Sequence, residues 1–333
     1  MRKKIGITGA SGFIGGSLAI ELKRRGYTVY GLDVISKDHL LPYMDKFEVE
    51  DYGNLPSHSK GMPLDLWLDC DAIIHCAGTS LVGPSIKKPI MYYENNVAKT
   101  INLLTWMVNM RHPGHFIFSS SASVYKTKNT PLTEEDTLQP LSPYAKSKMM
   151  IENVVEDFRN AHGLKACIFR YFNACGAMGE EHGQDPDASH IFPKLFESNY
   201  FTLNGSDYNT PDGSCVRDYI HVRDIVNAHA LAIESHLTGV YNLGNNFGYS
   251  NLEIIKAVEK AIGKKNIALG ERRKGDSDTL VADNTMARTM LGWAPVHTLD
   301  DIIKDLEKWY NSKIYKGYKW NQLSTNTFQQ RST

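Results

Sequence analysis

Three regularly spaced glycines near the start of the chain could bind a phosphate. Gly9, Gly12 and Gly15 stand in the string GASGFIG, between a short apolar run (KIGIT) and a helix-compatible run. Glycines at these positions permit a tight turn, close approach of the backbone to a pyrophosphate and close packing of the next helix. The N-terminus of that helix would face the anion. The pattern predicts a dinucleotide-binding turn.

An acidic residue ends the next apolar run. Asp33 follows TVYGL and lies 18 residues beyond Gly15. Its carboxylate could accept both hydroxyls of an adenosine ribose and would repel a 2′-phosphate. The following Val34 supplies no cation for such a phosphate. These features favour NAD over NADP as the cofactor.

The spacing GxxGxxG resembles the extended, nucleotide-sugar branch of the short-chain dehydrogenase/reductase superfamily. The strings FIFSSSASVY (116–125) and SPYAKSK (142–148) match that superfamily's Ser, Tyr and Lys. By this resemblance the catalytic residues are Ser121, Tyr144 and Lys148. Tyr144 and Lys148 stand four residues apart on an expected helix and therefore share one face. An ammonium beside a phenol stabilises the phenolate, which would lower the pKa of Tyr144 and make it a general base.

The resemblance extends from Lys4 to about Trp309 and implies a fuller set of binding residues. Its strings are most similar to UDP-glucose 4-epimerases: VGPSIKKPIMYYENNV (82–97), RYFNACGA (170–177), DGSCVRDYIHVRDI (212–225), YNLGNN (241–246) and RRKGD (272–276). Besides the glycine turn, it implies an NAD site lined by Phe13, Ile14, Asp33, Asp51, Tyr52, Cys76, Ala77, Gly78, Ser80, Asn96, Tyr144, Lys148 and Phe172. It implies a UDP-sugar site lined by Ser121, Tyr144, Asn173, His190, Ile191, Asn204, Arg217, Arg273, Asp276 and Leu280. Ser80 departs from the family, which usually has Lys there.

The charged members of the second set suit a nucleoside diphosphate. Arg217 and Arg273 offer planar forks for phosphate oxygens, and Asp276 offers an acceptor for ribose hydroxyls. For each arginine the alternative is an ion pair with Asp218 or Asp276. His190 could equally be a polar residue without a ligand, and no spacing of metal-binding side chains indicates a metal site.

The residues after the strand-end serine discriminate among the reactions of this superfamily. Related dehydratases and decarboxylases carry a carboxylate there, whereas Ala122 and Ser123 follow Ser121. We therefore predict NAD-dependent epimerisation at C4 of a UDP-hexose, interconverting UDP-glucose and UDP-galactose through a 4-keto sugar. The enzymatic alternatives are a UDP-N-acetylglucosamine 4-epimerase and another nucleotide-sugar oxidoreductase. The alternative from another class is a non-catalytic regulator that senses NAD.

One position bears on the choice of sugar. Leu280 lies four residues beyond Asp276, where the resemblance places a residue beside the hexose. Epimerases restricted to plain hexoses tend to have Tyr there. Because Leu is smaller, we predict activity on both UDP-galactose and UDP-N-acetylgalactosamine. The alternative is that Leu280 packs inward and other residues shape the pocket.

The elements that must position these residues alternate between strands and helices. Apolar runs at 4–8, 28–33, 72–78, 115–121 and 165–172 alternate with helical patterns, including those at 90–109 and 144–161. Such alternation predicts an α/β fold with a doubly wound parallel sheet. We expect an NAD-binding Rossmann domain at 1–173, a smaller α/β substrate domain at 174–310 with segments crossing back to the first, and a polar tail at 311–333.

Composition limits the partners and the compartment. Lys+Arg and Asp+Glu both number 37, so nucleic acid and anionic membrane surfaces are not expected partners. Five cysteines without a CxxC pair suit a reducing compartment, and we expect a cytoplasmic protein. No apolar run approaches the length of a membrane span.

A homodimer is expected from the two long helical patterns. The segments at 90–109 and 144–161 resemble the helices by which this family pairs its subunits. Apolar residues recur there at helical spacing, at Ile101, Leu104, Val108, Ile151, Val154, Val155 and Phe158. A helix that covers a sheet needs the same spacing, so this alternative stays open.

Overall fold

A computed structural model describes residues 2–54, 67–185, 190–272 and 276–317 of the chain. Its strands are β1 (Lys4–Thr8), β2 (Thr28–Asp33), β3 (Lys46–Val49), β4 (Ala72–His75), β5 (His115–Ser121), β6 (Ala166–Tyr171), β7 (Asn173–Cys175), β8 (Tyr200–Asn204), β9 (Val216–Arg217), β10 (Tyr219–His221), β11 (Gly239–Leu243), β12 (Tyr249–Ser250), β13 (Asn266–Gly270) and β14 (Thr279–Leu280). Its α-helices are α1 (Phe13–Arg24), α2 (Val82–Lys87), α3 (Pro89–Tyr92), α4 (Lys99–Asn109), α5 (Pro143–His162), α6 (Ile191–Glu197), α7 (Val222–Ser235), α8 (Asn251–Ile262), α9 (Thr285–Leu291) and α10 (Leu299–Asn311). Shorter helical turns include η1 (Asp38–Tyr43), η2 (Tyr52–Asn54), the π-helix η4 (Tyr93–Ala98) and η5 (Ala122–Val124).

Seven parallel strands form the main sheet, in the order β11-β6-β5-β4-β1-β2-β3. β4 and β6 are buried along their whole length, which is typical of a sheet covered on both faces. The strand order reverses at β1, between β2 and β4. In such sheets ligands bind outside the carboxyl ends of the strands, beside this reversal.

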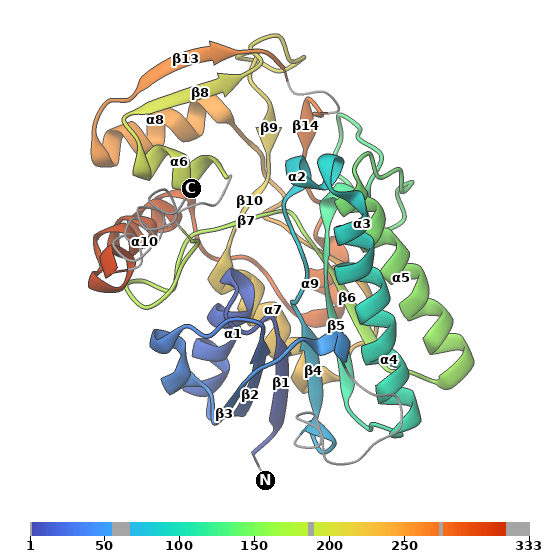
Figure 1. Cartoon of the computed structure of the whole chain (residues 1–333). Helices are drawn as coiled ribbons and strands as arrows, with labels where there is room; N and C mark the ends of the chain where they lie inside the picture. Colours follow the sequence, from blue (N-terminus) through green and yellow to red (C-terminus); the bar gives the residue numbers. More distant parts are fainter. Residues whose placement is uncertain (1, 55–66, 186–189, 273–275, 318–333) are drawn as a thin grey trace, which may run out of the picture.

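Helices cover both faces of the sheet (Figure 1). On one face, α1 and α7 bury Leu18, Ile20 and Ile225 in a core shared with β1 and β6. On the other face, α4 and α5 bury Leu103 and Ile151 against β4 and β5. The predicted doubly wound parallel sheet is confirmed.

Several elements differ from the sequence-based expectation. The strand β3 was not predicted, and its mixed sequence KFEV suits an edge position, where charged residues protect unpaired backbone groups. The helical pattern at 90–109 is divided into α3, the π-helix η4 and α4. β11 lies within the range 174–310 expected for the substrate domain but pairs with β6 in the main sheet, so this segment crosses back to the first half of the chain. The domain boundaries themselves stay a prediction.

The second half of the chain also builds three small sheets, β10-β7, β12-β9-β14 and β13-β8. Helices α6, α8 and α10 pack beside them around a separate core that includes Phe192, Ile254 and Ile302. The strands β9 and β14 have two residues each. Their positions therefore depend on side-chain contacts more than on the ladder of backbone hydrogen bonds.

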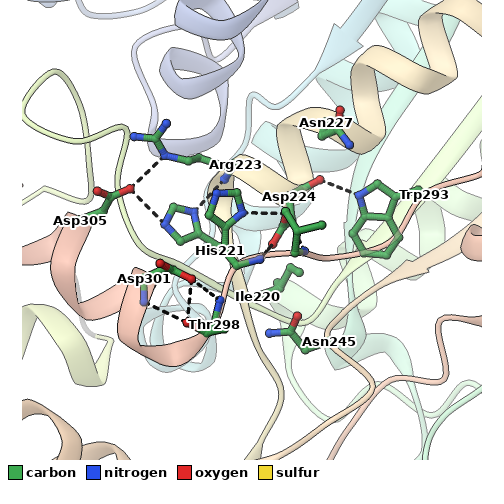
Figure 2. A network of polar contacts seen from close by, with 12 residues as sticks. Ile220, His221, Arg223, Asp224, Asn227, Asn245, Trp293, Thr298, Asp301 and Asp305 are labelled. Atoms are coloured by element: carbon green, nitrogen blue, oxygen red, sulfur yellow. Dashed lines mark hydrogen bonds and ion pairs between the residues drawn. The ribbon is translucent and has the colours of Figure 1, made fainter.

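A polar network joins α7, α10 and the connection that precedes α10 (Figure 2). The Asp305 carboxylate of α10 accepts a hydrogen bond of 3.0 Å from Arg223 and lies 3.5 Å from His221. Asp224 of α7 accepts a 2.8 Å hydrogen bond from His297, whose ring centroid lies 4.5 Å from that of His221. The network fixes α10 on α7, at the flank of the main sheet.

Within the described residues, no helix is long and apolar enough to cross a membrane. No group of three or more His, Cys, Asp or Glu side chains in the same ranges is arranged to hold a metal ion. The five cysteines are free thiols.

Candidate active site

The glycine turn connects β1 to α1 and packs tightly against the loop that follows β4. Gly9 has a φ of 69°, and a Cβ atom there would lie 2.6 Å from the Ala77 nitrogen. A Cβ atom at Gly15 would lie 2.1 Å from the Gly9 oxygen. Neither position accepts a side chain, so backbone N–H groups stay open to an anion at the start of α1. The turn therefore fits the pyrophosphate of a dinucleotide.

Asp33 ends β2 beside this turn, as expected. Its carboxylate accepts hydrogen bonds from the Ser11 N–H at 2.9 Å and the Ile35 N–H at 3.3 Å. Burial raises the pKa of Asp33, and these N–H groups and Lys37 partly oppose the rise. The acid is thus held in place by the glycine turn itself, with Phe13 and Ile14 beginning α1 next to it.

The loop after β4 is organised by Asn96 of η4. The buried Asn96 amide accepts from the Thr79 N–H at 2.7 Å, donates to the Thr79 carbonyl at 3.0 Å and donates to the Ser147 hydroxyl at 2.9 Å. Asn96 therefore links the loop that contains Cys76, Ala77 and Gly78 to helix α5. Asn96 was predicted from the sequence and Thr79 was not, because only the tertiary contact shows the role of Thr79. Ser80 is exposed in the same loop.

Asp51 and Tyr52 lie just beyond β3. The Asp51 carboxylate pairs with Lys99 at 2.5 Å and accepts from the Gly53 N–H. Burial raises the pKa of Asp51, but these partners outweigh it and lower the pKa. The Tyr52 ring is buried in the core, and its hydroxyl donates to the Asn95 carbonyl. The contact of either residue with a cofactor stays a prediction.

The sequence-predicted catalytic residues come from two adjacent elements. Ser121 ends β5, and its hydroxyl accepts a 2.9 Å hydrogen bond from Ser123. Tyr144 and Lys148 lie on α5, which begins after Ser142 as N-cap with Pro143 at the first position, and ends at Gly163 in the left-handed region. The Tyr144 ring packs edge-on against Tyr92, at 6.5 Å between centroids.

Burial controls the proton affinities of this pair. It lowers the pKa of Lys148 to about 8, with Cys76 and Glu152 opposing the shift. It raises the pKa of Tyr144, while a hydrogen bond with Ser121 opposes the rise. The expected lowering of the Tyr144 pKa by Lys148 was wrong for the protein's own groups. Burial of the phenol is the main reason that the Tyr144 pKa is raised, and the Lys148 ammonium donates to the Ser119 carbonyl at 2.8 Å.

A buried ion pair that was not predicted from the sequence lies near the predicted catalytic residues. The Glu152 carboxylate lies 2.6 Å from the Arg170 guanidinium, and each side chain is 5% exposed. Ser120 also donates to Glu152, and Arg170 donates to the Tyr125 hydroxyl at 2.8 Å. The signal that could have found it is the position of Glu152, four residues beyond Lys148 on the same face of α5.

The predicted UDP side is built around Arg217 of β9. Its guanidinium donates to the Asp276 carboxylate at 2.8 Å and to the Ser277 carbonyl at 3.0 Å. Asp276 also accepts from the Tyr208 hydroxyl at 3.2 Å. The ion pair considered as an alternative is thus present, and the fork of Arg217 is fixed in direction. Arg272, which sequence analysis missed, stacks on the Tyr208 ring at 4.1 Å.

The other predicted substrate residues lie on several elements. Asn173 begins β7, where its N–H donates to the Asp218 carbonyl at 2.8 Å, directly after the buried Phe172. His190 precedes α6, Ile191 begins it, and Asn204 ends β8. Arg273 lies outside the described residues.

Leu280 lies next to the catalytic strand end. In β14 it pairs with Arg217 of β9, and its half-buried side chain packs against a cluster that includes Ala122 and Phe172. The position therefore connects the UDP side with the residue that follows Ser121. Its contact with a sugar stays a prediction.

Known proteins of similar sequence and similar fold belong to one family. A family model described as the NAD dependent epimerase/dehydratase family matches residues 5–244. The UDP-glucose 4-epimerase of Lactobacillus helveticus is 39% identical over 95% of this chain and 99% of its own length. The structure of UDP-glucose 4-epimerase from Bifidobacterium longum in complex with NAD+ and UDP has a TM-score of 0.85 and 34% identity, over 94% of this chain and 99% of that chain. The UDP-Glc/GlcNAc 4-epimerase from Campylobacter jejuni has a TM-score of 0.77 and 29% identity, over 96% and 99%.

The chain belongs to the NAD-dependent epimerase/dehydratase family. Within it, UDP-glucose 4-epimerases from several bacteria and plants are 33% to 39% identical over most of the chain. The family predicted from the glycine turn and from the Ser, Tyr and Lys is confirmed.

Proposed function

We propose that this protein is a UDP-hexose 4-epimerase that interconverts UDP-glucose and UDP-galactose with NAD as its cofactor. One observation carries the proposal. Lys148 of the predicted Ser, Tyr and Lys set is linked to the loop after β4 through Ser119: Lys148 donates to the Ser119 carbonyl, and the Ser119 hydroxyl donates to the Cys76 sulfur at 3.2 Å. The catalytic strand β5 is thereby tied to β4, whose following loop packs on Gly9.

Tyr144 removes the proton from the C4 hydroxyl and later returns it. Ser121 hydrogen-bonds the same oxygen. The Ser123 hydroxyl donates to the Ser121 oxygen and thereby fixes the orientation of the Ser121 hydroxyl. Lys148 stands one turn further along α5 on the same face, where its ammonium donates to the Ser119 carbonyl. Bound NAD would supply a reversible hydride acceptor for C4, and return of the hydride to the opposite face of the sugar ring would leave no net oxidation.

The UDP part must stay bound while the sugar turns over as a 4-keto intermediate. Arg217 holds one phosphate, with Asp276 fixing its guanidinium and facing the ribose hydroxyls. Arg273 is the proposed second phosphate ligand. Strong contacts on the nucleotide and few on the hexose allow inversion without release of the substrate.

We further propose a homodimer formed by α4 and α5, which run side by side along one edge of the molecule (Figure 1). Of the apolar residues that suggested it, Leu104, Ile151 and Val155 are buried in the chain's own core. Ile101, Val108, Val154 and Phe158 are only half-buried. Exposed Ile90 and Met150 add apolar surface on α3 and α5.

The cytoplasm is the proposed location. The free thiols of all five cysteines agree with a reducing compartment. 

The test is incubation of the purified protein with UDP-galactose, UDP-N-acetylgalactosamine and UDP-xylose, followed by chromatographic resolution of the products. We expect UDP-glucose from UDP-galactose, with no accumulation of NADH. Stoichiometric NADH would indicate a dehydrogenase instead. Bound NAD without turnover of any sugar would favour the NAD-sensing regulator.

A further inference from the structure

A segment of the second half of the chain reaches over the cofactor half. Residues 177–185, called the clasp segment here, follow β7 and close on themselves, because the Met178 N–H donates to the His182 carbonyl at 2.7 Å. Glu181 of this segment pairs with Arg24 of α1 and accepts from the Tyr43 hydroxyl of η1 at 2.5 Å. The clasp segment is therefore attached to the C-terminal end of α1 and to the connection that follows β2.

Two further contacts bring the clasp segment to the residues beside Asp33. Asp185 pairs at 2.6 Å with Lys37, whose side chain is 7% exposed. Lys37 stands four residues after Asp33 and is near enough to act on its carboxylate. The clasp segment is thus attached beside Asp33, the residue that would bind the adenosine ribose.

His182 contacts the dinucleotide turn itself. Its ring is 1% exposed, and Nε2 lies 3.1 Å from the Gly12 carbonyl, while Nδ1 lies 3.3 Å from Nε2 of His39. A carbonyl only accepts, so Nε2 of His182 carries the hydrogen and Nδ1 accepts from His39. Burial, with Lys37 nearby, lowers the pKa of His182 to about 3, which keeps this arrangement neutral at physiological pH.

This contact also explains a fourth glycine that the dinucleotide pattern does not require. The motif reads GASGFIGG, and a Cβ atom at Gly16 would lie 2.6 Å from Nε2 of His182. The Gly16 N–H donates to the Gly12 carbonyl at 2.8 Å, which is the first hydrogen bond of α1. The Gly12 carbonyl oxygen therefore accepts two hydrogen bonds, one from the Gly16 N–H and one from the His182 ring, which uses its second lone pair.

The clasp segment is supported from its other side by α10. The Trp309 indole N–H donates to the Gln184 carbonyl at 3.0 Å, and a Cβ atom at Gly183 would lie 2.6 Å from the Trp309 ring. α10 is in turn fixed to α7 through Asp305 (Figure 2). The position of His182 is therefore determined by packed elements on both sides.

We propose that His182 is a positioning residue for the cofactor: it fixes the Gly12 carbonyl from the second half of the chain and thereby sets how slowly NAD leaves. The inference rests on the proposed function, in which NAD is the cofactor. A turn already held in its binding geometry loses less conformational entropy on binding. Differences in affinity of this kind fall mainly on the dissociation rate. The chemical groups on α5 are not touched by His182.

The experiment compares exchange of bound NAD for radiolabelled NAD in three purified full-length proteins. His182→Gln keeps a donor near the place of Nε2, whereas His182→Asn keeps a polar group only near Nδ1. Because one neutral hydrogen bond is lost, we expect NAD exchange to be about three- to tenfold faster in His182→Asn than in wild type. His182→Gln should stay close to wild type. Activity that His182→Asn loses on dilution should return when NAD is added.

A second variant tests the same contact from the helix side. Gly16→Ala should also speed NAD exchange in the wild-type background. It should add less in His182→Asn, where the ring no longer opposes the methyl group and Leu40 Cδ1, 2.7 Å from the added Cβ atom, is the close neighbour that remains. Gly83→Ala is the matched control, because a Cβ atom there meets no atom within 4 Å. It should exchange NAD like wild type.

Equal exchange rates in wild type and His182→Asn would overturn the inference, as would equal acceleration by His182→Asn and His182→Gln. If His182→Asn does not fold, the comparison of Gly16→Ala with Gly83→Ala decides instead. Wild-type protein that holds no NAD would overturn the proposed function together with the inference. Wild-type protein that holds NAD, with every variant unchanged, overturns the inference alone.

Discussion

The cofactor side and the UDP side of the candidate site are built on different kinds of backbone. On the cofactor side, the glycine turn follows β1, and Asp33 and Ser121 are the last residues of β2 and β5, in one seven-stranded parallel sheet. On the UDP side, Arg217 and Leu280 lie on strands of two residues, in a sheet of three strands. Arg217 is held there by its bonds to Asp276 and Ser277.

The difference corresponds to the different tasks of the two sides. Proton and hydride transfer at C4 require reacting groups that are fixed to a fraction of an ångström, and adjacent buried strands supply that precision. The UDP side has to retain a diphosphate while the sugar turns over, which needs affinity more than fixed geometry. Variants on the cofactor side should therefore act on kcat, and variants on the UDP side on KM.

The largest effect is expected from Tyr144→Phe. The change removes the proton acceptor and keeps the ring that packs on Tyr92. Turnover of UDP-galactose should fall by a factor on the order of 10² to 10⁴, with NAD and UDP binding nearly normal. Steady-state kinetics and NAD content measure the two quantities. Tyr200→Phe, at an exposed tyrosine, is the control. Retention of half the wild-type rate by Tyr144→Phe would assign the base to another residue.

Arg217→Met tests the UDP side. Loss of charge-assisted hydrogen bonds to a phosphate should raise KM for UDP-galactose by about 10- to 100-fold and change kcat little. Initial rates over a range of substrate concentrations separate the two parameters. Arg288→Met removes an exposed arginine from α9 and should change neither. If kcat falls and KM stays constant, the contrast between the two sides is wrong.

Leu280→Tyr tests the place where the two sides meet. A larger ring beside the cluster of Ala122 and Phe172 should exclude an N-acetyl group. The preference for UDP-galactose over UDP-N-acetylgalactosamine, as a ratio of kcat/KM, should rise by roughly 10-fold, since pocket size discriminates by about 1 to 3 kcal/mol. Leu269→Tyr, at an exposed leucine, is the control. Equal loss on both sugars, or a wild type inactive on the N-acetylated one, would remove Leu280 from this role.

The smallest effect concerns pH. The pKa of Lys148 is lowered to about 8, so its ammonium is present below that pH and is lost as pH rises through it. We expect kcat to fall severalfold between pH 7 and 9. Lys148→Arg should be slower but keep a flat profile there, because a guanidinium stays protonated. Lys146→Arg changes a residue on the exposed face of α5, and the kcat of this variant should depend on pH as in wild type. A similar fall in Lys148→Arg would assign the titration to another group, Tyr144 first.

Much of the cofactor side could be predicted from the sequence because its signals are local. The glycine spacing, the acid after β2 and the four-residue interval between Tyr144 and Lys148 each lie within one unit of structure. The alternation of apolar runs and helical patterns predicts the parallel sheet for the same reason. On the UDP side the strands β9 and β14 are too short to give a periodic signal, and the resemblance to a family supplied those residues.

The sequence by itself predicted the fold, since periodicity and spacing act over a few residues, and its resemblance to a family predicted the catalytic groups. Only the tertiary structure decided how those groups are charged and held. Burial lowers the pKa of Lys148, and the ammonium of Lys148 donates to the Ser119 carbonyl. Arg170 meets Glu152 across two elements, and His182 meets Gly12 across 170 positions of sequence. Such contacts depend on how distant segments pack, which no local pattern encodes.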